Sequence, residues 1–306
     1  MENERNYGES VIHGVQELTS EDKKYAAEHL NETDENREDA IAKIRCWTEN
    51  ELCIRTDNYL ILQFLRVCKF NLEKTKNRMQ NYYKQRSALP DWYMNKDPFQ
   101  PELQEMLDMG VCLPLRKLDS QGRLVFIVRL FQHDPTIHKL TDLIKVFMAL
   151  LDLTMRNNAT ASIYGFALYV DMTNPTVRHI SQISPLLIWN GIHALQSCFP
   201  IRMGSLNYCN TPPIVNGIIK IARACMTEKL KKRFHVYPHM LRSCFKDIPS
   251  DILPIEYGGT DGTIQELTDY WKKLVENNRD WIMSNENNQI YTLHTNTLHT
   301  NNIFEQ

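Results

Sequence analysis

The sequence predicts an α/β fold: a small helical domain followed by a domain with a mixed, partly parallel sheet. Three observations predict it. Only helical periodicity appears before about residue 95, strand-like and helix-like segments alternate from about 110 to 260, and apolar residues make up 42% of the 306 residues. Strands that alternate with helices are typical of a partly parallel sheet. The length and composition suit one large globular domain with a smaller partner.

The first part of the chain predicts a lead and a helical domain. Residues 1–17 are polar and acidic, so we expect a disordered lead and no secretory signal. Over 18–95, helix-start residues precede "EDKKYAAEHL" and "NYLILQFLRVCKF", and "REDAIAKIRCWTEN" and "NLEKTKNRMQNYYKQR" continue as helices. "LPDWYMNKDPFQPEL" contains three prolines and predicts a connection to the next domain.

Residues 96–283 predict the α/β domain. "VCLPLRK" and "RLVFIVRL" form an expected hairpin, followed by a helix over 141–157 and a buried strand in "SIYGFALYVDM". "ISQISPLLIWNGIHALQSCF" predicts one helix, and "IRMGSLNYCN" and "FHVYPH" predict strands. "DILPIEYGGT" is an expected loop and "TIQELTDYWKKLVENNRDWI" the last helix. The Asn- and Thr-rich residues 284–306 predict a flexible tail.

Charge and cysteine usage exclude several classes. The net charge of −2 argues against a nucleic-acid-binding protein, and no apolar run reaches the roughly 18 residues that a bilayer span needs. Any membrane contact is therefore expected to be peripheral. Eight cysteines without a CxxC pair predict reduced thiols in a cytoplasmic protein.

No catalytic motif appears, so we expect neither an enzyme nor a cofactor. The sequence contains no GxSxG, Walker A, HExxH or GxGxxG pattern. "GGTDG" predicts a turn, and Pro238 between His235 and His239 argues against a metal-binding helix, so we expect no metal. His133 beside Asp134 is interpreted as a loop residue and His193 as a hydrogen-bonded core histidine.

An amphipathic helix is expected over 213–226, directly before a cationic run. Its apolar positions recur every three or four residues: Pro213, Ile214, Val215, Ile218, Ile219, Ala222, Cys225 and Met226. From 220 to 233, six basic residues and the acidic Glu228 give a local charge of 6 − 1 = +5. An ordinary surface helix with a solvated end explains the same pattern.

Several segments together resemble the CRAL-TRIO family. They are "YLILQFLRVCKFNLEKTKNRMQNYYKQR", "GFALYVDMTN", "SCFPIRMGSLNYCNTPPI", "MTEKLKKRF" and "DILPIEYGG", and they cover roughly 20–282. The branch with α-tocopherol transfer protein and cellular retinaldehyde-binding protein is the most similar. The resemblance implies a Sec14-like fold whose sheet floors an apolar cavity under a helical lid. It implies binding and transfer of a small hydrophobic lipid, released at membranes when the helix over 213–226 opens.

The resemblance also implies which residues line the ligand cavity, although ordinary core packing explains each of them equally well. The expected ligand-binding residues are Ile144, Phe147, Leu151, Phe166, Val170, Ile183, Leu187, Gly191, Ala194, Leu195, Ile201, Leu206, Ile218 and Ile219. Phe147 and Leu151 stand where the tocopherol binder has serines, so a polar group of the ligand would need Tyr169, Tyr164 or His193. A tocopherol-like, retinoid, carotenoid, sterol or other isoprenoid ligand stays open.

Contact with anionic membranes is expected from a set of basic residues. They are Arg202, Lys220, Arg223, Lys229, Lys232 and Arg233. Cys68, Asn77 and Gly204 stand where the family pattern has arginines. We therefore expect general attraction to anionic lipid and leave phosphoinositide recognition open.

Two other functions remain open. One is a lipid-sensing regulatory scaffold without transfer activity, and the less favoured one is a lipid-metabolising enzyme with a non-local site. We expect a monomer in the cytoplasm that contacts membranes transiently.

Overall fold

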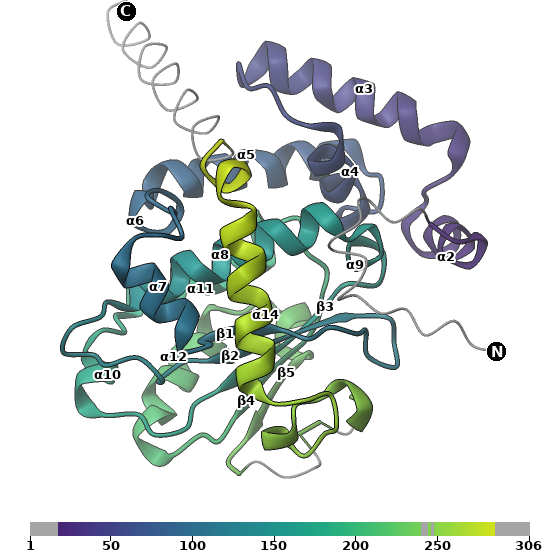
Figure 1. Cartoon of the computed structure of the whole chain (residues 1–306). Helices are drawn as coiled ribbons and strands as arrows, with labels where there is room; N and C mark the ends of the chain where they lie inside the picture. Colours follow the sequence, from purple (N-terminus) through teal and green to yellow (C-terminus); the bar gives the residue numbers. More distant parts are fainter. Residues whose placement is uncertain (1–17, 240–243, 246–247, 285–306) are drawn as a thin grey trace, which may run out of the picture.

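The computed structural model describes residues 18–239, 244–245 and 248–284. The predicted lead over 1–17 and all but the first residue of the predicted tail over 284–306 lie outside the described residues. Helices α8 and α9, introduced below, lie between the N-terminal helices and the sheet (Figure 1). The boundary that we place between 95 and 96 stays a prediction.

The N-terminal part is helical, as predicted. Its helices are α2 Ser20–Leu30, α3 Asp34–Glu51, α4 Asn58–Val67, α5 Leu72–Ala88, α6 Pro90–Tyr93 and α7 Pro101–Asp108. Thr19 begins α2 with a capping box, because its side chain accepts from the Asp22 amide while the Asp22 carboxylate accepts from the Thr19 amide.

The segment predicted to connect the domains contains α6 and the first three residues of α7. Proline occupies the first helical position of each. Proline suits this position because a backbone N–H at the first residue of a helix has no acceptor within the helix, so its absence costs no hydrogen bond.

The sheet has five strands in the order β1-β2-β3-β4-β5. They are β1 Cys112–Pro114, β2 Leu124–Arg129, β3 Phe166–Asp171, β4 Met203–Cys209 and β5 Phe234–Tyr237. β1 and β2 form the predicted antiparallel hairpin, and β2 to β5 are parallel. The expected mixed, partly parallel sheet is therefore confirmed.

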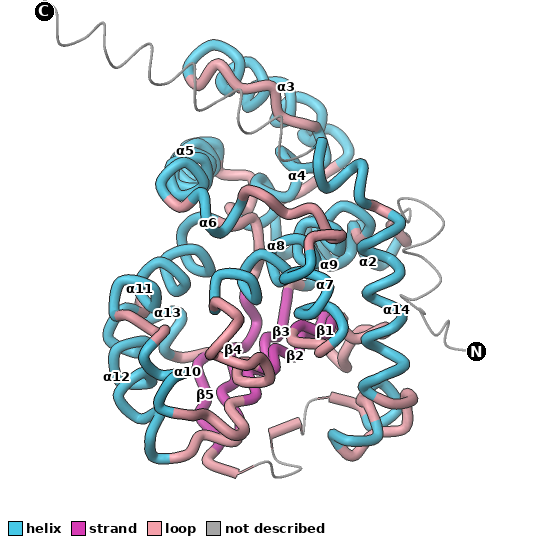
Figure 2. The backbone as a smooth tube through the Cα atoms, turned by 60° about the vertical axis from the view of Figure 1, so that its left-hand side comes forward, coloured by secondary structure: helices cyan, strands magenta, loops and turns pink. Residues whose placement is uncertain are grey.

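The remaining helices cover the sheet, with α11 and α12 on one side of the strands and α14 on the other (Figure 2). The α-helices are α8 Leu140–Asn157, α9 Ala159–Tyr164, α10 Val177–Ser181, α11 Pro185–His193, α12 Asn216–Cys225, α13 Glu228–Lys231 and α14 Ile264–Asn277. The short elements are the π-helix η1 Ala194–Cys198 and the 3-10 turns η2 Pro213–Val215, η3 Ser250–Ile252 and η4 Ile255–Tyr257.

Two predicted elements need correction. The helix expected over 180–199 is divided, because the Ser184 side chain caps a new helix whose first residue is Pro185. The strand expected over 162–172 begins only at Phe166, because α9 occupies the preceding residues and ends at Gly165. The start of α11 is therefore set by a helix cap and the start of β3 by a glycine, although the apolar pattern continues across both positions.

The two faces of the sheet have different neighbours. Val128, Val170 and Tyr208 occupy one row across β2, β3 and β4, and all three line a cavity with residues of α8, α11 and α12. Tyr169 lies between these positions along β3, so its side chain points to the opposite face, where it stacks on Phe245. The cavity is therefore confined to one face.

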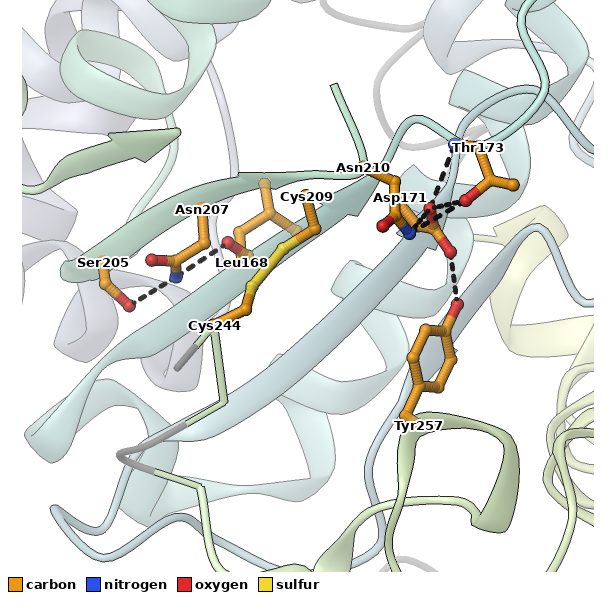
Figure 3. Close-up of a disulfide and its surroundings, with 9 residues drawn as sticks. All are labelled: Leu168, Asp171, Thr173, Ser205, Asn207, Cys209, Asn210, Cys244 and Tyr257. Atoms are coloured by element: carbon orange, nitrogen blue, oxygen red, sulfur yellow. Dashed lines mark hydrogen bonds between the residues drawn. A yellow bond between two sulfur atoms is a disulfide. The ribbon is translucent and has the colours of Figure 1, made fainter. Parts of the chain in front are cut away.

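The carboxyl ends of β3 and β4 are joined by side-chain contacts (Figure 3). Asp171 at the end of β3 accepts hydrogen bonds from the Asn210 amide at 2.9 Å and the Tyr257 hydroxyl at 2.9 Å. Cys209 at the end of β4 is disulfide-bonded to Cys244. This corrects the prediction that the thiols are all reduced, since two cysteines separated by 35 residues meet only in the folded chain.

Candidate functional site

An apolar cavity of about 190 Å³ lies between the sheet and helices α8, α11 and α12. No charged side chain lines it within the described residues. Its walls are Trp92, Val128, Leu130, Leu140, Leu143, Ile144, Phe147, Met148, Leu151, Leu168, Val170, Met172, Ile183, Leu187, Ile188, Gly191, Ile192, Ala194, Leu195, Phe199, Tyr208 and Ile218. Such an enclosure binds hydrocarbon and disfavours charge.

The local sequence explains how this cavity forms. Helix α8 turns Ile144, Phe147 and Leu151 toward the sheet at three- and four-residue steps. Gly191 leaves open space in α11, since a Cβ built there meets no atom within 4 Å outside its own helix. The cavity therefore lies where a helix presents a glycine instead of a side chain.

The structure brings many of the expected ligand-binding residues together. Those that line the apolar cavity are Ile144, Phe147, Leu151, Val170, Ile183, Leu187, Gly191, Ala194, Leu195 and Ile218. Phe166 and Leu206 are buried in strands outside it, Ile219 is half-buried in α12, and Ile201 lines a different pocket.

The polar partners suggested for a ligand do not line the apolar cavity. The Tyr164 hydroxyl donates to Asp22 at 3.0 Å, and Tyr169 lies on the other face of the sheet. His193 is half-buried and stacks on Trp189 with ring centroids 4.9 Å apart, so its interpretation as a core histidine is wrong. Burial, together with the charge of Arg78, lowers the pKa of His193.

Helix α12 and the turn before it have one buried side and one exposed side. Val215, Ala222 and Met226 are buried, and Ile218 lines the apolar cavity. Ile214 of the preceding turn is 45% exposed, and Trp189 of the neighbouring helix α11 is 48% exposed. The helix predicted as a lid thus has apolar residues both on the cavity and in solvent.

A second cavity of about 430 Å³ is cationic. We call it the cationic pocket, and its charged lining residues are Lys69, Arg78, Arg123, Arg202, Lys229 and Arg233. Among the described residues no aspartate or glutamate lines it, although the lining Arg123 donates to the Asp119 carboxylate at 2.6 Å. Burial is the main cause that lowers the pKa of Lys229, and nearby cations, first Arg233 and then Arg78, lower it further. Like charges gathered in this way create a site that a bound anion would stabilise.

The sequence predicted half of the cationic pocket. Arg202, Lys229 and Arg233 line it, whereas Lys220, Arg223 and Lys232 lie exposed outside it. The sequence pattern did not predict the other three cations, which are Lys69, Arg78 and Arg123.

A signal for these three was nevertheless present. Lys69 and Arg78 each follow by one residue the positions, Cys68 and Asn77, where the family pattern has arginines. Arg123 lies against Gly204, because a Cβ at Gly204 would be 2.7 Å from the Arg123 Cδ. The space that a side chain at 204 would need is therefore filled by an arginine from another segment.

The cationic pocket and the apolar cavity meet at Leu195 in η1. The Arg78 guanidinium donates to the carbonyl oxygens of Phe199 at 2.7 Å and Gln196 at 3.0 Å. It also donates to the Leu195 carbonyl at 3.4 Å, and the Leu195 side chain lines both cavities. Loss of the Arg78 hydrogen bonds would therefore alter the position of residues that form the wall of the apolar cavity.

Across the described ranges, no helix is both long and apolar enough to cross a bilayer. The same part of the chain contains no group of three His, Cys, Asp or Glu side chains placed to hold a metal ion.

Comparison with known proteins gave two family matches. The model described as "CRAL/TRIO domain" matches residues 108–259, and the model described as "Pinta-like, UBA domain" matches 33–103. The chain is similar to human clavesin-2, with 28% identity over 206 residues, or 67% of this chain and 63% of that protein. The match thus spans less than two thirds of the clavesin-2 chain.

Two further proteins are similar over a longer part of the chain. The human alpha-tocopherol transfer protein-like protein is 28% identical over 246 residues, or 79% of this chain and 71% of that protein. Among solved structures, the crystal structure of Sfh5 aligns with a TM-score of 0.48 and 13% identity over 82% of this chain and 92% of that chain.

Proposed function

The chain belongs to the CRAL/TRIO family, and from this premise we propose that it binds a small lipophilic molecule and transfers it between membranes. The observation that carries the proposal is the apolar cavity, which has hydrocarbon walls, no charged side chain and an amphipathic helix along one side. Burial of apolar surface there would supply the affinity at about 25 cal/mol per Å².

The size of the apolar cavity favours a lid. Its volume of about 190 Å³ is below the roughly 300–1,000 Å³ of ordinary ligand pockets. A lipophile of isoprenoid size would therefore have to displace part of the wall. Helix α12 is the element proposed to move, because Ile218 faces the cavity while Lys220 and Arg223 face solvent.

Membrane contact would drive this movement. Ile214 and Trp189 are exposed apolar side chains on and beside the proposed lid, and Lys220 and Arg223 lie exposed on α12. Amphipathic helices with this composition bind the interface of a bilayer. Each basic residue near an anionic surface contributes about 1 kcal/mol to the attraction.

The cationic pocket is proposed to hold a multiply charged anionic headgroup, with a phosphoinositide as the leading candidate. Its six basic side chains come from several segments, and of them Arg123 is paired with the Asp119 carboxylate, at 2.6 Å. The lowered pKa of Lys229, caused first by burial, supports an anion as the missing partner. An anion that drew Arg78 from the carbonyl oxygens of Gln196 and Phe199 would loosen the wall of the apolar cavity and favour release.

Transfer between vesicles tests the proposal. Ile218→Asp puts a carboxylate into the apolar cavity, where an unpaired charge is unfavourable, so transfer of a fluorescent lipophile should be lost. Ala224→Asp is the matched control, because Ala224 is exposed on the same helix. Transfer by Ile218→Asp at the wild-type rate would remove α12 from the mechanism.

The same assay separates the other functions. Ligand binding without accelerated exchange would identify a lipid-sensing scaffold, and consumption of substrate in excess of the protein would identify an enzyme. We propose neither, because hydrocarbon walls and an exposed amphipathic helix suit exchange with a membrane.

A further inference from the structure

The apolar cavity contains very few polar side-chain groups. Among its lining residues, only Tyr208 and Trp92 have a side-chain O–H or N–H. Within the described residues, neither the Tyr208 hydroxyl nor the Trp92 indole N–H has a hydrogen-bond partner, whereas the hydroxyls of the half-buried Tyr83 and Tyr257 do. A hydroxyl that faces hydrocarbon without a partner costs free energy, so its place in a hydrocarbon wall points to a partner that comes from outside the chain.

The position of Tyr208 is well defined. The side chain projects from β4 in the same row as Val170, and its ring contacts the Phe234 ring edge-on with centroids 4.9 Å apart. Burial raises the pKa of Tyr208 to about 12, so the hydroxyl stays protonated and can both donate and accept. The residue is half-buried and lines the apolar cavity. A rigid sheet thus presents one neutral polar group to an otherwise apolar space.

Water does not satisfy this site well. An ordered buried water typically makes about three hydrogen bonds, whereas the side chains of this cavity offer only the two polar groups of Tyr208 and Trp92. An ionised group does not suit it either, because no cation lines the cavity and an unpaired buried charge is strongly unfavourable. What remains is a neutral oxygen on a lipophilic skeleton.

We propose that Tyr208 is the specificity-determining residue of the apolar cavity and hydrogen-bonds the hydroxyl or carbonyl oxygen of a neutral lipophile. This inference rests on the proposed function and adds a ligand class to it. Alcohols, aldehydes, ketones and esters belong to the class. Ionised fatty acids do not, and the charged headgroup of a phospholipid would have to stay outside this cavity.

Paired lipophiles test the assignment. The protein is incubated with neutral vesicles that contain retinol, cholesterol and 1-octadecanol, each mixed equally with the hydrocarbon of the same skeleton, and protein-bound molecules are measured by mass spectrometry. The wild type should prefer the alcohol of at least one pair by about 3- to 10-fold, the usual worth of one neutral hydrogen bond. Tyr208→Phe should reduce that preference to about one while still taking up the hydrocarbon.

The controls separate the possible failures. Tyr169→Phe loses the same hydroxyl on the opposite face of the sheet and should keep the wild-type preference. A preference that survives Tyr208→Phe, or that is lost only in Trp92→Phe, would overturn the role of Tyr208 while leaving lipid binding intact. Uptake of neither member of any pair by the folded wild type would overturn the lipid-binding proposal and this inference with it.

Discussion

Gly191→Leu should stabilise the protein and abolish ligand uptake at the same time. Gly191 lies in α11 and lines the apolar cavity, and an added Cβ meets no atom within 4 Å outside its own helix. A leucine there would occupy part of a space of only about 190 Å³. The substitution therefore separates the stability of the fold from the volume that a ligand needs.

The expected stabilisation follows from helix propensity. Glycine inside a helix is less favourable than leucine by about 0.8 kcal/mol, and burial of the new side chain adds to this. For a domain of this size, 1 kcal/mol corresponds to a rise in Tm of roughly 2–4 °C. Uptake of retinol, cholesterol and 1-octadecanol should fall by more than 10-fold, because the remaining space is too small for any of them.

Gly217→Leu is the matched control. Gly217 is exposed in α12, has the same open space around its Cβ position and does not line the apolar cavity. Tm is measured by calorimetry and uptake by mass spectrometry. Wild-type uptake by a stable Gly191→Leu protein would refute the cavity as the ligand site. A lowered Tm would refute the open space that the structure shows beside Gly191.

Three other predictions concern charge and thiols. Lys69→Gln combined with Lys229→Gln should weaken binding to anionic vesicles by about 25-fold, because each cation contributes about 1 kcal/mol. The control Lys24→Gln with Lys84→Gln removes two exposed cations, so the protein has the same net charge and its vesicle affinity should change little. Equal losses of affinity in the two double variants would refute the cationic pocket as the site of binding. The lowered pKa of Lys229 means that an anion bound in the cationic pocket promotes proton uptake. The affinity for inositol trisphosphate, measured by calorimetry, should therefore fall as the pH rises from 7 to 10, and the fall should begin below the ordinary lysine pKa near 10.4. Lys229→Arg should make the affinity less dependent on pH. An equal pH dependence in the wild type and in Lys229→Arg would contradict titration of Lys229 as the cause. Thiol titration of the denatured protein should count six free thiols before reduction and eight after it, and eight at both stages would contradict the disulfide.

Much of the fold could be predicted because its signals are local. Helix caps, prolines and apolar spacing act within a few residues, so the helix over 141–157 and the amphipathic helix after Pro213 were predicted nearly to the residue. The same reasoning missed the break at Ser184, since the apolar pattern continues through a cap and a proline that begin a new helix. At Ser184 the apolar pattern favours one continuous helix, but the capping side chain and the following proline begin a new one.

The sequence by itself determined an α/β chain with an amphipathic helix and a cationic run beside it. Only the tertiary structure decided which residues meet in the two cavities. Lys69, Arg78 and Arg123 reach the cationic pocket from separate segments, and no sequence period links them. Tyr208 faces the apolar cavity because parallel pairing places it in register with Val170. Strand register and helix crossover join positions far apart in the chain, and periodicity along a single segment does not contain that information.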